Sequence, residues 1–200
     1  MPITEHPLGL TWVADDALQR AAHALAHDGK VWLVDPFEQG DAIERAAALG
    51  EVAGVLQLFV AHERDGKAIA DRLDAPFFSL PSNVPDAPFD VVDVSLLVWK
   101  ERALWWPERR GLVVAESIGT APHLAVGPGP AGVHPLRRGF PPAGPLKALA
   151  PEHLLVGHGH PVHGPDATTA LQEALHRSRR DIPTLVVKLP GIFRSMQGRR

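Results

Sequence analysis

The sequence contains no cysteine among its 200 residues. This absence excludes disulfide bonds, iron–sulfur clusters, zinc sites with thiolate ligands and a cysteine nucleophile. A metal site, if the chain has one, must therefore be built from the nitrogen and oxygen atoms of histidine, aspartate and glutamate.

The chain also lacks a long apolar run and an excess of positive charge. No apolar run approaches the roughly 20 residues needed to span a bilayer, and residues 1–7 lack a basic segment followed by an apolar core. The net charge of -3 gives no broad attraction to nucleic acid. We therefore expect neither a membrane nor a nucleic acid as partner, and a cytoplasmic location as the default.

The composition is that of one globular unit. A chain of this length with 45% hydrophobic residues can build one sizeable core. The segment 119–145 is rich in glycine and proline, but no second core follows it, so it is expected to be an ordered functional loop or lid. We predict a single domain over residues 1–200, in which residues 182–200 form a C-terminal tail.

Apolar runs that end in polar loops recur along the chain. Residues 31–34 end at Asp35, and residues 55–60 lead directly into a polar loop at 61–66. Two later runs, 111–115 and 153–157, lead into Glu116 and His158. The order of these strands and loops resembles the metallo-β-lactamase superfamily, over residues 9–180. The resemblance implies an α/β (α+β) fold, a four-layer αββα sandwich of two mixed sheets with helices outside.

Local patterns add further elements. Helices are predicted near residues 40–50, at 65–73 and at 165–181, where the apolar residues share one face. Residues 19–26 are rich in alanine and favour a helix, but Asp28 and Gly29 followed by a strand favour a hairpin, so we predict a strand. Short strands at 96–99, 103–106 and 112–115 are predicted to form a meander.

The resemblance places the His-x-His-x-Asp-His metal motif on the loop after residue 60, where most of its ligands are missing. If His62 is the first histidine, the other ligand positions carry Arg64, Gly66 and Lys67. If Asp65 is the motif's aspartate, they fall on residues 61, 63 and 66. Neither alignment supplies more than two ligands, residues 89–99 contain no histidine, and Arg64 and Lys67 would repel a cation. We therefore predict that the two-zinc site is degenerate.

A smaller metal site stays open as a hypothesis. His62 or Glu63, Asp65, Glu116 and His158 would lie on neighbouring loops of the implied fold. They could hold one zinc, manganese or iron ion in a hydrolase of a small ester, thioester, amide or phosphoester. Asp65 and His158 would be the catalytic residues. The alternative is that no cofactor binds, that Asp65 caps the following helix and that His62 bonds within its loop. The degraded motif favours this alternative.

Other histidines offer further candidates. His158, His160 and His163 are closely spaced, and we expect one of them to be a ligand and two to face solvent. His123 and His134 belong to the segment 119–145 and would reach the site if that loop folds over it.

Two functions without catalysis compete with the hydrolase. Arg64 and Lys67, joined by Arg137 and Arg138, could form a pocket for an anionic small molecule, unless they are ordinary surface cations. A third possibility is an interaction module, a homodimer, because Trp105 and Trp106 must point to opposite faces of a strand and one could be exposed beside the tail. Ordinary burial under the segment 119–145 explains both tryptophans at least as well. The residues alone do not decide whether the chain is an enzyme.

Overall fold

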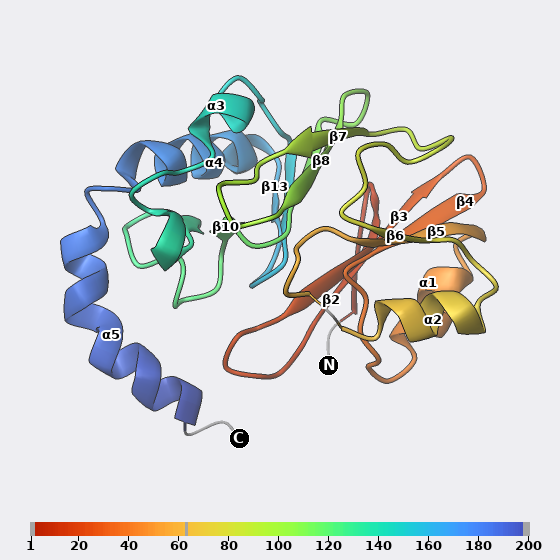
Figure 1. Ribbon diagram of the computed structural model, residues 1–200, viewed down its shortest axis with the longest axis horizontal. Coiled ribbons are helices and arrows are strands. Elements are labelled where there is room, and N and C mark those ends of the chain that lie inside the picture. Colours follow the sequence, from red (N-terminus) through yellow and green to blue (C-terminus); the bar gives the residue numbers. More distant parts are fainter. Residues whose placement is uncertain (1–2, 63, 198–200) are drawn as a thin grey trace.

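The computed structural model describes residues 3–62 and 64–197 and contains two mixed β-sheets with helices around them (Figure 1). Within the described residues, the first sheet has six strands that neighbour each other in chain order: β1 (Ile3–His6), β2 (Gly9–Val13), β3 (Ala21–His27), β4 (Lys30–Val34), β5 (Glu51–Gln57) and β6 (Phe77–Ser79). The strands from β1 to β4 are antiparallel, and β4, β5 and β6 are parallel.

The second sheet has five strands in the order β13-β12-β9-β8-β7. Their bounds are β7 (Asp90–Asp93), β8 (Arg102–Trp106), β9 (Gly111–Val114), β12 (His153–Val156) and β13 (Val162–His163). Strands β9 and β12 are parallel, whereas the other pairs are antiparallel. A small ladder of β10 (Ile118–Gly119) and β11 (Gly132–Val133) follows β9.

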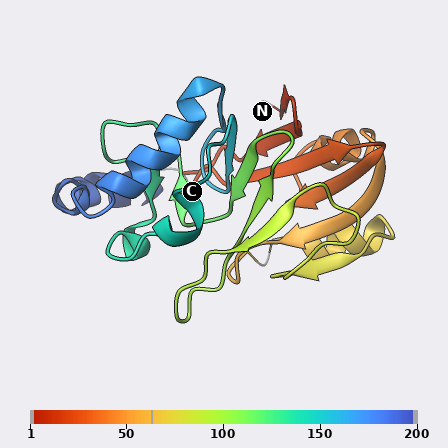
Figure 2. The same ribbon diagram turned by 90° about the horizontal axis from the view of Figure 1, so that it is seen from above.

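The helices are α1 (Ala42–Ala47), α2 (Gly66–Arg72), α3 (Ala143–Leu146), α4 (Pro165–Arg177) and α5 (Ile182–Gln197), with a 3₁₀ turn at Pro135–Arg137. The helices α1, α2 and α4 cover the outer faces of the two sheets, and α5 lies at the outer edge of the molecule (Figure 1). Seen from above, α1 and α2 lie on one side of the molecule and α4 on the other, with the strands between them (Figure 2). The fold is the four-layer αββα sandwich that the sequence predicted.

Three apolar clusters fill the spaces between these layers. Trp32, Leu56 and Leu104 belong to the cluster between the two sheets. A second cluster joins the first sheet to α1 and α2, and a third joins the second sheet to α4. Since both faces of each sheet are covered, the central strands are apolar on both sides, which is why they read as continuous apolar runs in the sequence.

Strand β3 shows how packing overrides helix propensity. The alanine-rich segment is a strand, as predicted, and its residues 21–25 are buried. The turn that follows has positive φ angles at Asp28 (47°) and Gly29 (76°), the conformation of a two-residue hairpin. The small side chains of β3 suit a strand that is covered on both faces.

The predicted meander needs one correction. Residues 103–106 and 112–115 correspond to β8 and β9, but the third strand is β7 and not residues 96–99. Leu96 and Trp99 instead close a tight turn, and Leu97 and Val98 at its tip are 82% and 91% exposed. The apolar composition of residues 96–99 suggested a strand, but the side chains of Leu97 and Val98 pack against no layer of the fold.

The C-terminal tail and the tryptophans also differ from expectation. Residues 182–197 form the helix α5, which the sequence did not predict. Trp106 is buried between the sheets, and Trp105 is half-buried against the cluster under α4, so neither is the exposed tryptophan that a dimer contact required. Within the described residues, none of the helices combines the length and the apolar character needed to cross a membrane.

Candidate functional site

Three strand ends meet at one edge of the sandwich. His62 lies in the loop after β5, Glu116 follows β9, and His158 follows β12. Because β9 and β12 are parallel and Val114 pairs with Val156, the two residues placed two positions later lie side by side. Gly157 permits this approach, since a Cβ there would lie 1.9 Å from the carbonyl oxygen of Ala115.

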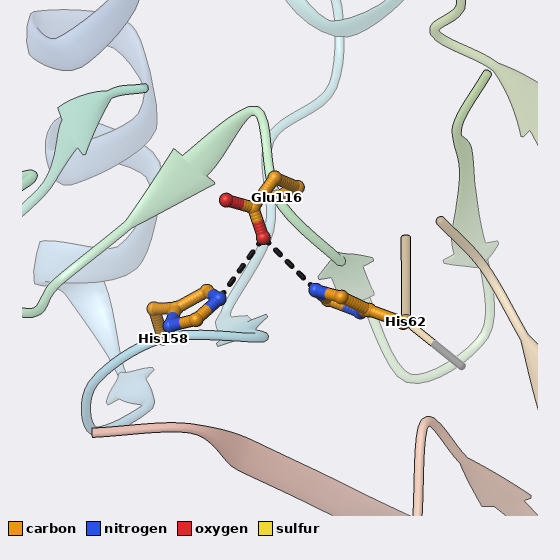
Figure 3. Close-up of side chains that lie close together, drawn as sticks. All are labelled: His62, Glu116 and His158. Carbon is orange, nitrogen blue, oxygen red and sulfur yellow. Dashed lines mark hydrogen bonds and ion pairs between the residues drawn. The ribbon is translucent and has the colours of Figure 1, made fainter. Parts of the chain in front are cut away.

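The side chains of His62, Glu116 and His158 converge on one point (Figure 3). Glu116 Oε2 lies 2.9 Å from His62 Nε2 and 2.9 Å from His158 Nε2. One potential ligand atom from each residue lies within 4.8 Å of the other two. All three side chains are largely shielded from solvent.

The far nitrogen of each imidazole is held by a hydrogen-bond acceptor. His62 Nδ1 lies 2.8 Å from Asp35 Oδ2, and His158 Nδ1 lies 3.0 Å from the carbonyl oxygen of Leu18. A carbonyl or carboxylate oxygen can only accept, so Nδ1 carries the proton in both rings. Glu116 Oε2 is an acceptor as well, so Nε2 donates to it when a proton is present. If a metal ion took the place of that proton, the neutral ring would direct the Nε2 lone pair at the ion, which is how histidines that bind metal are oriented.

Charges in this cluster favour the ionised carboxylates. Burial alone would raise the pKa of Glu116, but the hydrogen bonds and charges of His158 and His62 lower it well below its usual range. Burial likewise opposes the ionised form of Asp35, yet His62 and Arg64 lower its pKa. The pKa of His62 is raised: burial would lower it, but the charge of Asp35 and the hydrogen bonds that His62 donates to Asp35 and Glu116 outweigh burial.

A second buried carboxylate, Glu101, holds the loop that carries Glu116. Glu101 Oε1 accepts hydrogen bonds from the backbone N–H groups of Glu116 (2.8 Å) and Ser117 (2.9 Å). Glu101 Oε2 accepts from the Ser117 hydroxyl and, at 2.6 Å, from Trp99 Nε1. The sequence offered no signal for this role, because Glu101 reads as part of the polar turn 100–102.

Asp65, proposed as a ligand and catalytic residue, does not join the cluster. Its Oδ2 accepts a hydrogen bond from the backbone N–H of Glu38 at 2.8 Å. Asp65 occupies the N-cap position of α2, but its side chain makes no capping hydrogen bond to that helix. Glu63, the alternative ligand from this loop, lies outside the described residues.

The proposed anion-binding cations are engaged elsewhere. Arg64 Nη1 donates to the carbonyl oxygens of Ala21 (2.6 Å) and Asp35 (2.9 Å), so the guanidinium ties two strands together. Lys67 pairs with Asp71 on its own helix, at 2.8 Å. Arg137 and Arg138 are buried and donate to backbone carbonyl oxygens of Val94 and Leu124. The structure does not bring these four cations together in one pocket.

The remaining histidines separate into two groups. His134 Nε2 lies 3.4 Å from Glu116 Oε1, and the ring of His123 lies 5.8 Å from that of His158, so the segment 119–145 folds against the site. His160 is exposed, as expected for two of the three closely spaced histidines His158, His160 and His163. His163 does not face solvent freely, because its Nδ1 lies 2.9 Å from His153 Nδ1 on the neighbouring strand.

The cluster opens into a cavity of about 710 Å³. His62, Glu116, His158, His123 and His134 contribute polar groups to its lining. Apolar side chains of the loop before β3, of the loop after β5 and of α5 line much of the remainder. A cavity of this size is sufficient for a small organic ligand.

Two mixed sheets packed face to face, helices outside, and polar residues gathered at the strand ends define the metallo-β-lactamase fold. Similar solved structures share it. The metallo-β-lactamase FIM-1 from Pseudomonas aeruginosa, in its mono-zinc form, matches with a TM-score of 0.60 and 9% identity, over 90% of this chain and 97% of that one. A metallo-β-lactamase from Hirschia baltica matches with a TM-score of 0.57 and 11% identity, over 88% and 98%.

The similarity extends to a protein with a different metal. TTHA1623 in a di-iron-bound form matches with a TM-score of 0.55 and 16% identity, over 87% of this chain and 96% of that one. The TM-scores establish a shared fold, and at these low identities any activity has to be argued from the site itself. A scan against models of protein families gave no match, and a search of curated proteins gave none either.

Proposed function

We propose that this protein is a hydrolase that uses one divalent metal ion, zinc, manganese or iron, held by His62, Glu116 and His158. The observation that supports the proposal is the convergence of these three side chains at the polar end of a cavity. Two imidazole nitrogens and one carboxylate oxygen form a donor set that holds catalytic zinc and leaves a position open. When bound, such an ion makes a water molecule nucleophilic at neutral pH and polarises a carbonyl oxygen.

The donor atoms fit an ion of this kind. Ligand atoms at about 2.0–2.2 Å from one metal are about 3–4 Å from one another. Each Nε2 atom lies 2.9 Å from Glu116 Oε2, and the three donor atoms all lie within 4.8 Å of one another. These distances are close to the spacing that one ion requires. The Nδ1 hydrogen bonds of both rings turn Nε2 towards Glu116 Oε2, and a bound ion would replace the two contacts between Nε2 and that oxygen.

The proposal is for a single ion because the neighbouring positions offer no second set of ligands among the described residues. Arg64 places a guanidinium against the backbone of Asp35, and the Asp65 carboxylate is turned to Glu38. The substrate class consistent with this fold is a small ester, thioester, amide or phosphoester.

The chain's own residues prepare the site in two ways. Asp35 fixes the tautomer of His62, and Glu101 fixes the backbone of Glu116. His134 adds a hydrogen-bond donor: its Nδ1 accepts from the backbone N–H of Leu136, so its Nε2 carries the proton and faces the cavity. The nitrogen of that N–H lies 3.4 Å from Glu116 Oε1, and a substrate oxygen bound beside the cluster would compete with Glu116 for the N–H.

The decisive experiment is metal content per chain, measured by elemental mass spectrometry on tag-free protein. We expect about one ion per chain in the wild type, retained in His160→Ala and lost in His158→Ala and Glu116→Gln. His160→Ala is the matched control, since it removes an exposed imidazole from the same loop. Absence of metal after reconstitution with zinc, manganese and iron would refute the proposal.

The two alternatives have less support. An anionic ligand would need cations that are available, and Arg64 and Lys67 are both engaged. A homodimer through tryptophan would need an exposed ring, and Trp106 is buried.

A further inference from the structure

One wall of the cavity consists of the C-terminal helix. Leu185, Leu189, Ile192 and Phe193 of α5 line it. Their spacing of four, three and one residues places them on a single face of the helix. Figure 1 shows α5 at the outer edge of the molecule, on the side of α4 and away from α1 and α2.

This wall is anchored to the rest of the chain. Leu185 is buried, and Lys188 Nζ donates to the carbonyl oxygen of Val126 at 2.9 Å. This hydrogen bond directs the ammonium group of Lys188 to the segment 119–145. The α5 side chains that line the cavity are the apolar ones named above.

Apolar residues from other elements face α5 across the cavity. Leu18 precedes β3, Phe59 follows β5, and Pro135 begins the 3₁₀ turn; all three line the same space. The cavity thus combines a polar end, at His62, Glu116 and His158, with an apolar chamber.

The two guanidinium groups that line this cavity are engaged, and another charged side chain of the lining, Asp65, is an acid. Arg20 Nε lies 2.7 Å from Asp16 Oδ2, and Arg64 donates to backbone carbonyl oxygens. Among the described residues that line the cavity, neither guanidinium is therefore left to neutralise an anionic ligand. The part of a ligand that lies against the apolar side chains of α5 is expected to be apolar, because a charge there would lose its hydration without compensation.

We infer that the substrate is an ester or thioester with an apolar acyl chain, which lies along α5 while its carbonyl group reaches His62, Glu116 and His158. This inference rests on the proposed function for its chemical step. In that step the oxygen of water bonds to the acyl carbon, the bond from that carbon to the alcohol oxygen or thiol sulfur breaks, and the leaving atom takes a proton. The apolar chamber supplies the binding energy and the selection for chain length.

Binding of an apolar chain in the cavity can be measured separately from hydrolysis. The probe is N-phenyl-1-naphthylamine, a neutral fluorophore that brightens in apolar sites, displaced by methyl ketones of increasing chain length that cannot be hydrolysed. We expect the ketone affinity to rise about fourfold for each added CH₂ until the chamber is full, as burial of one CH₂ predicts.

Two variants of α5 locate the site. Leu189→Asp puts a charge into the chamber, and we expect it to abolish the dependence on chain length. Val187→Asp is the matched control, because Val187 lies on the same helix and is 80% exposed; it should behave as the wild type. Circular dichroism of both variants checks that the fold is retained.

The outcomes separate this inference from the proposed function. Ketone affinity that is independent of chain length, or unchanged in Leu189→Asp, overturns the acyl-chain inference whatever the metal content. Rising affinity in a chain that binds no metal upholds the apolar chamber and removes the hydrolytic step. With metal bound, p-nitrophenyl esters should show a lower KM for octanoate than for acetate, and Leu189→Asp should raise the KM for octanoate while kcat changes little.

Discussion

At the scale of single residues, Asp35 controls which nitrogen of His62 faces the site. Its Oδ2 lies 2.8 Å from His62 Nδ1, and its Oδ1 accepts from the backbone N–H of Leu58 at 2.9 Å. Both oxygens are thus used, and both partners are donors. A carboxylate is the side chain that satisfies two donors at once in this geometry.

The substitution Asp35→Asn tests this control. Asp35 has a φ of 45°, a conformation that asparagine tolerates, so the backbone should be unaffected. The amide can still accept from Leu58, but its NH₂ group then faces His62 Nδ1 and favours the tautomer with the proton on Nε2. We expect metal affinity to fall by about 10- to 100-fold, measured by competition with a chromophoric chelator.

Asp65→Asn is the control for that measurement. Asp65 contacts the backbone of Glu38 and not the cluster, so its substitution should leave metal affinity unchanged. Equal losses in the two variants would show that the loop holding Asp65 takes part in binding, in contradiction to the orientation in this structure.

Of the candidate site residues, the structure brings together those that follow closely on a strand, and their role as ligands stays a prediction. His62, Glu116 and His158 were candidates because apolar runs lead into them, and parallel strands bring such ends together. Asp65 was included by motif spacing alone, and the structure turns it away from the cluster. Glu101 was missed because its role depends on hydrogen bonds to the backbone of a distant loop, which no local pattern records.

At the scale of elements, the sequence predicted strands with buried neighbours better than it predicted α5. Strand β3 could be separated from a helix by the turn at Asp28 and Gly29. Helix α5 contains Pro190, and its run of residues 184–189 includes β-branched side chains, which disfavour a helix. Its helical state is supported by tertiary contacts such as the burial of Leu185, which are not visible in a local window.

Truncation after Asp181 tests how far α5 is separate from the rest of the fold. Among the α5 side chains that the structure describes, Leu185 is the apolar one that is buried, so its loss should cost about 2 kcal/mol of unfolding free energy. We expect the truncated protein to unfold cooperatively in denaturant, with a modest decrease in midpoint. A collapse of the unfolding transition would mean that α5 is part of the main core.

The same truncated protein also tests the homodimer alternative. Ile182, Val186, Val187 and Phe193 are exposed on α5, and they are the apolar surface that the tail offers to a second copy. Sedimentation of the full chain across concentrations, compared with the truncated chain, would show a dimer that depends on α5 if this alternative holds. A monomer in both cases removes it.

At the scale of the whole molecule, a buried chain of hydrogen bonds links the two sheets and makes stability depend on pH. His6 Nε2 lies 2.9 Å from Thr11 Oγ1, which lies 2.8 Å from His23 Nδ1, and His23 Nε2 donates to the carbonyl oxygen of Val156 at 3.1 Å. Burial lowers the pKa of His23 to about 3, and burial together with the charges of other histidines lowers that of His6 to about 4.

The sign of the effect follows from these lowered values. Between pH 6.5 and about 3, His23 is protonated in the unfolded chain but neutral in the folded one, so the unfolded state binds more protons and is favoured by acid. The contribution is complete above pH 6.5 and is lost as the pH falls. Each such group should change the unfolding free energy by about 1.4 kcal/mol per pH unit in this window.

The variant His23→Gln isolates this contribution. Glutamine can donate to Val156 and accept from Thr11, but it does not titrate, so its unfolding free energy should fall less steeply between pH 6 and pH 5. We expect the slope to differ from that of the wild type by about 1.4 kcal/mol per pH unit, from denaturant unfolding at several pH values. The control His160→Gln removes an exposed histidine and should keep the wild-type slope. Identical slopes for His23→Gln and the wild type would mean that His23 is protonated in the folded protein, and the two sheets would then be joined there by a charged group.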